Sequence, residues 1–261
     1  MRLILCDTAD QVSDVASKQI IAQYQARHKP RPFVLGLPTG GTPLKIYARL
    51  ITAYQQQQID FKNIITFNMD EYLGLSADHP ASYAYYMQQH FFKHIDIPAE
   101  QTHLLNGITS DCEQTCQRYE DLIHQFGPIN LMLGGLGVDG HLAFNEPGSP
   151  FDSRTRRVIL SDSTRLSNSR FFNNTISQVP LAALTIGLGT LLEAEKIIIV
   201  VTGENKAKAL RAALEGPITA TCPASCLQRH PNAWIICDKA ATQQLSDSYI
   251  ASLPSHNVLR G

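Results

Sequence analysis

Three side chains that can transfer protons lie close together in one glycine-rich segment. The segment GVDGHLAFNEPG (residues 137–148) contains Asp139, His141 and Glu146, and it follows the apolar run at 129–133. An aspartate two residues from a histidine can orient and charge the imidazole, and a nearby glutamate can tune that imidazole or relay its proton. A lone histidine is usually only a satisfied polar residue, whereas this grouping after a predicted strand favours proton-transfer chemistry.

A pair of adjacent carboxylates follows a second apolar run. Asp70 and Glu71 stand within NMDEY, directly after the run IITF. Neighbouring side chains point in different directions, so we expect at most one of the two to enter a cleft. The other is expected to be structural.

A loop that suits an anion follows the apolar run FVLGL. The loop reads PTGGTP, with Thr39, Gly40, Gly41 and Thr42 at its centre, and it leads into a helix predicted to begin near Pro43. The two glycines let the backbone approach a ligand, and the free N–H groups of a helix N-terminus attract an anion. A tight strand-to-helix turn without a ligand explains this loop equally well.

A lysine stands in the first turn of another predicted helix. Lys206 follows the run KIIIVV and the residues TGEN, and it precedes the helical stretch AKALRAALEG. A cation there opposes the helix dipole, which indicates an anion nearby, although a solvated surface lysine is more common. Together with the PTGGTP loop and an arginine from the irregular segment 147–182, Lys206 indicates a phosphate pocket.

The elements that position these residues alternate between apolar runs and helical patterns. The apolar runs lie at 2–5, 33–37, 64–68, 129–133, 196–201 and 233–237. Such runs are typical of strands covered on both faces, and the capping boxes TADQ (8–11) and SDCE (110–113) begin helices between them. The alternation predicts an α/β fold with a mainly parallel central sheet, in which ligands bind beyond the carboxyl ends of the strands.

Length and composition favour one domain. The chain has 261 residues, of which 44% are hydrophobic, and no repeat or linker divides it, so residues 1–261 are expected to form a single domain. The segment 147–182 is the least regular part of the chain. Its composition fits a lid or a plain surface excursion equally well, and we place a lid at about 161–180.

Charge and motif content exclude several functions. Lys and Arg total 22 against 23 Asp and Glu, for a formal net charge of −1, so neither a nucleic acid nor a membrane surface is an expected partner. The N-terminus lacks a secretory apolar region and no stretch reaches the roughly 18 apolar residues of a membrane span, which predicts a cytoplasmic protein. The 6 cysteines form no CxxC pair and GxGxxG is absent, so neither a metal nor a nucleotide cofactor is expected.

The combination of these groups fits aldose–ketose chemistry on a phosphosugar. A histidine would open the hemiacetal ring, and a carboxylate would move the C2 proton to C1. The four segments LGLPTGGTP (35–43), TFNMDEYLGL (66–75), GGLGVDGHLAFNEPG (134–148) and SRTRRVIL…TRLSNSRFF (153–172) resemble the glucosamine-6-phosphate deaminase family, also called glucosamine-6-phosphate isomerase. The resemblance extends over nearly the whole chain.

The resemblance implies a fold and a reaction. The fold is a three-layer modified Rossmann-like α/β fold, with a mainly parallel central sheet and a lid segment. The reaction converts glucosamine 6-phosphate and water to fructose 6-phosphate and ammonia without a cofactor. Asp70 would take the C2 proton and deliver it to C1, and His141 would open the ring, with Asp139 and Glu146 orienting it and setting its charge.

The resemblance also implies two anion sites. The substrate phosphate would be held by the Thr39–Thr42 loop, Arg170 and Lys206. Family members activated by N-acetylglucosamine 6-phosphate use a serine, an arginine and a lysine at a second site between subunits. Ser149 and Arg156 match two of these three positions.

The third position of that second site departs from the family pattern. Val158 replaces the lysine, and Pro150 replaces a second serine. We therefore expect N-acetylglucosamine 6-phosphate to activate the protein weakly or not at all. Two assemblies are compatible with the sequence: a monomer, or a homo-oligomer such as the hexamer that usually accompanies this activation.

Two rival functions remain for a chain of this pattern. A 6-phosphogluconolactonase-like hydrolase would share the phosphate loop but would not need the carboxylate of NMDEY beside the full DGHLAFNEP segment. A non-catalytic phosphosugar-sensing domain would carry an N-terminal helix-turn-helix, whereas here the predicted sheet begins at Arg2. Release of ammonia from glucosamine 6-phosphate separates the three functions.

Overall fold

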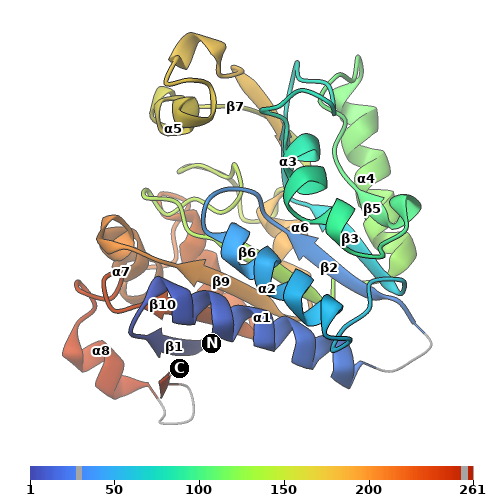
Figure 1. Ribbon diagram of the computed structural model, residues 1–261. Helices are drawn as coiled ribbons and strands as arrows, with labels where there is room; N and C mark the ends of the chain where they lie inside the picture. Colours follow the sequence, from blue (N-terminus) through green and yellow to red (C-terminus); the bar gives the residue numbers. More distant parts are fainter. Residues whose placement is uncertain (28–30, 254–257, 261) are drawn as a thin grey trace.

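The computed structural model describes residues 1–27, 31–253 and 258–260 and contains a parallel central sheet (Figure 1). Eight strands lie in the order β11-β1-β10-β9-β6-β2-β3-β5, and every neighbouring pair is parallel. Their bounds are β1 Arg2–Cys6, β2 Phe33–Leu37, β3 Ile64–Asn68, β5 Thr102–His103, β6 Leu131–Gly135, β9 Ile197–Val201, β10 Ala233–Asp238 and β11 Val258–Arg260. The six strands expected from the apolar runs are therefore present, and all belong to this sheet.

Helices cover both faces of the sheet and make the fold three layers thick. Helices α1 (Ala9–Ala26) and α2 (Pro43–Gln55) lie side by side across one face (Figure 1) and share one hydrophobic cluster with strands β2 and β10. On the other face, α4 (Cys112–Phe126), α6 (Leu188–Leu192) and α7 (Ala207–Glu215) enclose a second cluster. The other α-helices of the described residues are α3 (Tyr83–His90), α5 (Asp162–Asn168) and α8 (Asp247–Ser252), and short 3-10 helices lie in the connecting segments.

The helix start at 8–11 is confirmed, and the start at 110–113 is shifted by one residue. Thr8 caps α1 in a full capping box with Gln11. Helix α4 is capped by Asp111, whose carboxylate accepts a hydrogen bond from the Gln114 backbone at 2.9 Å, so the expected box beginning at Ser110 is not formed. An aspartate at the N-cap performs the same function as a serine.

A small antiparallel sheet stands beyond the carboxyl ends of the main strands. Its order is β4-β8-β7, formed by Asp70–Tyr72, Ala182–Thr185 and Arg156–Ile159. This sheet has its own hydrophobic cluster, which includes Tyr72, Phe144 and Phe172. The segment 161–180 runs over this cluster as α5 and the short helices Ser169–Phe171 and Ile176–Gln178.

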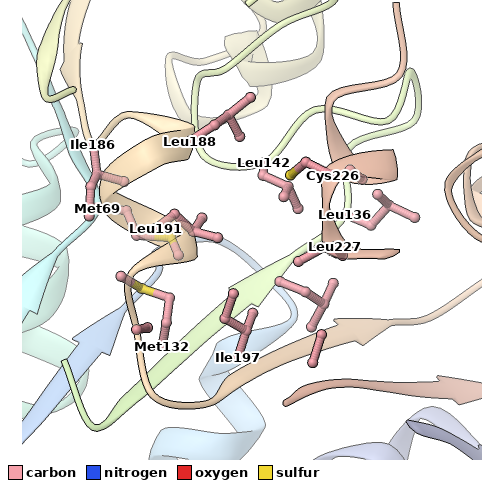
Figure 2. Close-up of a cluster of buried hydrophobic side chains, with 14 of the residues drawn as sticks. Met69, Met132, Leu136, Leu142, Ile186, Leu188, Leu191, Ile197, Cys226 and Leu227 are labelled. Atoms are coloured by element: carbon pink, nitrogen blue, oxygen red, sulfur yellow. The ribbon is translucent and has the colours of Figure 1, made fainter. Parts of the chain in front are cut away.

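The core beneath the small sheet fixes the start of β4. Met69 and Ile186 lie together at the edge of the cluster shown in Figure 2, and the Ile186 backbone N–H donates to the Met69 carbonyl at 2.7 Å. Because Met69 is buried, Asp70, the residue that follows it, has little freedom to move.

Among the residues that the structure describes, no helix is long and apolar enough to cross a bilayer.

Candidate active site

One cavity of about 530 Å³ brings most of the expected site residues together. It lies where β2, β6 and β9 end, as expected for a parallel sheet, and it is closed on other sides by α3 and the segment 161–180. The expected residues that line it are Thr39, Gly40, Gly41, Thr42, Asp70, Asp139, His141, Arg170 and Lys206. Glu146, Ser149 and Arg156 are not among the lining residues.

Asp70 is the buried carboxylate of this cavity. It is only 7% exposed, at the first position of β4, opposite Thr185 of β8. Burial, followed by the charge of Glu71, raises the pKa of Asp70 to about 8. A carboxylate with such a pKa is a stronger base than an ordinary aspartate, and it can both take and return a proton near neutral pH.

Glu71 has a structural role, as expected for the second member of the pair. Its carboxylate accepts three backbone hydrogen bonds at 2.8–2.9 Å, from Tyr72, Tyr83 and Ala84. Two of these donors belong to the N-terminus of α3, where a carboxylate is favourable. Glu71 therefore connects the start of α3 to strand β4, directly after Asp70.

Asp139 and His141 form a close pair in the loop after β6. An Asp139 carboxylate oxygen lies 2.6 Å from Nδ1 of His141. Burial raises the pKa of Asp139, but the bonding and charge of His141 outweigh it and lower this pKa to about 2. The ring packs against Gly137, where an added Cβ atom would overlap the His141 ring, so a larger residue there would displace the imidazole.

Among the described residues, Glu146 forms its side-chain hydrogen bonds with Ser161 and not with His141. Its carboxylate accepts hydrogen bonds from the hydroxyl of Ser161 at 2.9 Å and from the Ser161 backbone at 3.2 Å. Ser161 is also the N-cap of α5, since its hydroxyl accepts from the Thr164 backbone. Glu146 thus connects the loop that carries His141 to the beginning of the segment 161–180.

The PTGGTP loop exposes backbone N–H groups at the start of α2. Thr42 occupies the N-cap without a side-chain cap, and Pro43 stands at the first helical turn. Four N–H groups at a helix start lack partners within the helix, so an uncapped start can accept an anion. Gly40 has a φ of 114°, a conformation that side chains rarely adopt.

Two cations face the same cavity from different segments. Arg170 comes from the segment 161–180, and Lys206 ends the short helix Glu204–Lys206 that precedes α7. Burial, followed by repulsion from Arg170, lowers the pKa of Lys206. Within residues 1–27, 31–253 and 258–260, neither cation forms an ion pair with a carboxylate. Two cations that line one cavity and form no ion pair with a described carboxylate are suited to a dianion such as phosphate.

Ser149 and Arg156 lie together outside the cavity. The Arg156 guanidinium donates to the Ser149 hydroxyl at 3.3 Å and to the Asn145 side chain at 2.8 Å. Val158, two residues further along β7, packs against the hydrophobic cluster of the small sheet.

The tyrosines of the cavity were not expected from the sequence. Tyr72 lies on β4, and Tyr83, Tyr85 and Tyr86 lie on α3, all of them lining the cavity. The stretch SYAYYMQQH was the available signal, because Ser82 caps α3 and the three tyrosines that follow it lie in the first turn of the helix. No three His, Cys, Asp or Glu side chains of the described chain are grouped as ligands of one metal ion.

Comparison with known proteins gives consistent results over nearly the full length. Residues 7–236 match the family described as glucosamine-6-phosphate isomerases/6-phosphogluconolactonase. The glucosamine-6-phosphate deaminase of Vibrio cholerae serotype O1 is 51% identical over 265 residues, which cover 99% of each chain. A solved structure of a monomeric glucosamine-6-phosphate deaminase has a TM-score of 0.90 at 40% identity, covering 94% of this chain and 100% of its own.

The second activity in the family description is represented by a more distant structure. A 6-phosphogluconolactonase from Trypanosoma cruzi has a TM-score of 0.75 at 21% identity, covering 94% of this chain and 97% of its own. Similarity at this level establishes a shared fold only.

Proposed function

The chain belongs to the glucosamine-6-phosphate deaminase family, and we propose that its reaction, the conversion of glucosamine 6-phosphate and water to fructose 6-phosphate and ammonia, takes place in the 530 Å³ cavity. The observation that carries this proposal is the meeting of three features in one cavity. They are Asp70 with its raised pKa, the Asp139–His141 pair, and the two cations Arg170 and Lys206, which have no carboxylate partner in the described part of the chain. The steps proposed below use these side chains and water, and they call for no cofactor.

The first step opens the sugar ring at His141. The imidazole accepts the proton of the C1 hydroxyl and returns a proton to the ring oxygen, which gives the open-chain aldehyde. The low pKa of Asp139 keeps its carboxylate ionised, so this carboxylate holds the His141 imidazole in place through Nδ1. We propose that Glu146 acts together with Asp139 and His141. Its carboxylate is hydrogen-bonded to Ser161 in this structure, so its part in ring opening depends on the position of the segment 161–180.

The second step is the aldose–ketose conversion at Asp70. The carboxylate removes the proton from C2 while O1 of the aldehyde takes a proton from water, which leaves an enol-amine between C1 and C2. The Asp70 carboxyl then delivers its proton to C1, and the nitrogen gives up a proton to the hydroxide. The product carries an imine at C2. Water adds to this carbon, the C–N bond breaks, and ammonia leaves, so the ketone of fructose 6-phosphate remains. A raised pKa favours the return of the proton as well as its removal.

Ammonia release tests the function directly. The purified protein is expected to release one ammonia for each fructose 6-phosphate formed from glucosamine 6-phosphate. A lactonase would hydrolyse 6-phosphogluconolactone in a parallel assay, and it has no need of a buried base for a C–H proton. A sensing domain would bind glucosamine 6-phosphate without turnover, so either of these two results would overturn the proposal.

The segment 161–180 is proposed to act as a lid. It carries Arg170, which must reach the phosphate, and it begins at the Ser161 bond to Glu146. We expect its amide hydrogen exchange to slow severalfold when the Asp70→Asn variant is saturated with glucosamine 6-phosphate. Exchange in α1, which is remote from the cavity, serves as the internal control. Identical exchange in 161–180 with and without the sugar phosphate would remove the lid from the proposal.

The protein is expected to respond weakly or not at all to N-acetylglucosamine 6-phosphate. Ser149 and Arg156 are in contact, but Val158 offers no charge or hydrogen-bond donor to an effector phosphate. Losing one cation removes about 1–3 kcal/mol, which is the size of a typical coupling energy. Initial rates against glucosamine 6-phosphate should therefore be unchanged by saturating effector. A sigmoidal curve that the effector makes hyperbolic would show a working second site, with exposed Arg157 as the first residue to examine.

The assembly and location of the protein stay predictions. The related deaminase of known structure is described as monomeric, which makes a monomer the first expectation for this chain. Sedimentation with and without glucosamine 6-phosphate would distinguish a monomer from a hexamer. The cytoplasmic location expected from the sequence likewise stays a prediction.

A further inference from the structure

Two tyrosine hydroxyls hold the backbone of the PTGGTP loop from outside. Tyr47 of α2 donates to the Pro38 carbonyl at 2.5 Å, and Tyr86 of α3 donates to the Gly40 carbonyl at 2.6 Å. Tyr47 is fully buried in the core, stacked on Phe91 at 4.7 Å between ring centroids. The first bond therefore anchors the start of the loop to the core, and the second reaches its centre.

The carbonyl held by Tyr86 controls the direction of a neighbouring N–H group. A peptide unit is planar and trans, so the Gly40 carbonyl and the Gly41 N–H point in opposite directions. Glycines stand on both sides of this unit, and Gly40 already has a φ of 114°. With no Cβ atom on either side, sterics alone do not select one orientation of the unit. The Tyr86 hydroxyl supplies the missing constraint.

Tyr86 is itself fixed by the rest of α3. The backbone N–H groups of Tyr83 and Ala84, at the start of this helix, donate to Glu71. The Tyr86 ring packs against His90 with 4.8 Å between centroids. Burial raises the pKa of Tyr86, so its hydroxyl keeps the proton that it donates. Helix α3 thus connects Glu71, the neighbour of Asp70, to Gly40 at the centre of the PTGGTP loop.

We propose that Tyr86 is a positioning residue for phosphate recognition, whose hydroxyl orients the Gly40–Gly41 peptide so that the loop presents its N–H groups to the phosphate. This inference rests on the proposed function of the cavity. Tyr86 acts through the backbone and does not supply the phosphate contact itself. Its effect is therefore expected on binding, while the proton transfers at Asp70 and His141 proceed as before.

The Tyr86→Phe variant tests this role because it removes one hydroxyl and keeps the ring. A net hydrogen bond of about 1 kcal/mol corresponds to roughly fivefold, so we expect KM for glucosamine 6-phosphate to rise about 3–10-fold. The inhibition constant of inorganic phosphate should rise by the same factor, and kcat should stay within twofold. Tyr54→Phe, on α2 and outside the cavity, is the matched control and should leave all three constants unchanged.

Three outcomes would overturn the role of Tyr86. Unchanged KM and phosphate inhibition would show that the Tyr86 hydroxyl does not orient the loop for phosphate. A lower kcat at constant KM would show that Tyr86 acts on the proton-transfer steps. A raised KM with unchanged phosphate inhibition would mean that Tyr86 contacts the sugar. A wild-type protein that neither binds phosphate nor turns over glucosamine 6-phosphate would instead refute the proposed function.

A double-mutant cycle separates loop positioning from a general loss of structure. Gly40→Ala strains the same peptide unit, since Gly40 requires a positive φ and has no atom within 4 Å of an added Cβ. If both changes act on one peptide orientation, the double variant should raise KM by less than the product of the single effects. Multiplicative effects would show independent actions and contradict the proposal.

Discussion

Replacing Asp70 by asparagine is expected to lower kcat by about 10²–10⁴-fold while KM and phosphate affinity are retained. Asparagine nearly preserves the shape of the side chain but cannot accept the C2 proton, and a general base typically contributes a factor of this size. Turnover should be measured by ammonia release, and binding by calorimetry with glucosamine 6-phosphate. Asp78→Asn, at an exposed aspartate between β4 and α3, should retain activity within twofold.

The same variant should also be more stable, and the gain should depend on pH. The pKa of Asp70 is about 8 in the folded protein and near 3.8 in an unfolded chain, so the folded state binds the proton more tightly. The stability contributed by the protonated carboxyl is present below pH 4 and is lost as the pH rises through 8. Asparagine does not titrate, so the Asp70→Asn variant does not lose this stability as the pH rises.

The stability difference can be measured as a difference in Tm. Relief of about 2 kcal/mol or more corresponds to roughly 4–8 °C for a chain of this size at pH 8, falling towards zero near pH 4. A variant that is inactive and less stable at pH 8 would indicate a damaged fold. Retention of most activity would remove Asp70 from the mechanism.

Replacing Lys206 by alanine is expected to raise KM for glucosamine 6-phosphate by about 10–100-fold with little change in kcat. A charged hydrogen bond to phosphate contributes about 1.5–3 kcal/mol, and this contact is made equally in the ground state and the transition state. Lys206 has no carboxylate partner among the described residues, so its loss leaves no buried charge unpaired.

The control for Lys206 lies two residues away. Lys208 is an exposed lysine on α7, and Lys208→Ala should change KM by less than twofold. Inhibition by inorganic phosphate should weaken in parallel with KM in Lys206→Ala. A large fall in kcat at constant KM would mean that Lys206 acts on the reacting atoms, and its phosphate role would be wrong.

The main sheet was predictable because its strands are buried on both faces. Continuous apolar runs mark β2, β3 and β9, and their loops carry the site. Strand β6 begins at Leu131, later than the run at 129–133, and it continues into Gly134 and Gly135, which weaken the strand signal.

The small sheet was not predictable from periodicity. Strand β4 is entirely buried, yet it consists of Asp70, Glu71 and Tyr72, so its residues carry no apolar signal. Burial of these groups is decided by contacts with α3, which follows the next loop of the chain, and with β8, which is distant in sequence. The raised pKa of Asp70 has the same origin, since it requires both burial and the neighbouring charge.

The partners of two site residues depend on the tertiary structure. Sequence spacing placed Glu146 near His141, whereas its carboxylate is bonded to Ser161, 15 residues further along the chain. The contact between Tyr86 and Gly40 spans 46 residues. Local spacing predicts which groups are present, but contacts across elements decide what each group touches.

The position of β1 affects the order in which the protein can form during synthesis. This first strand pairs with β10 and β11, so both of its neighbours come from residues 233–260. While the ribosome makes the intervening chain, the apolar residues of β1 have no sheet to join, although β2 and β3 can already pair. The nascent chain therefore exposes an unpaired apolar strand until residues 233–260 have been made, and its protection until then depends on chaperones or on the packing of α1.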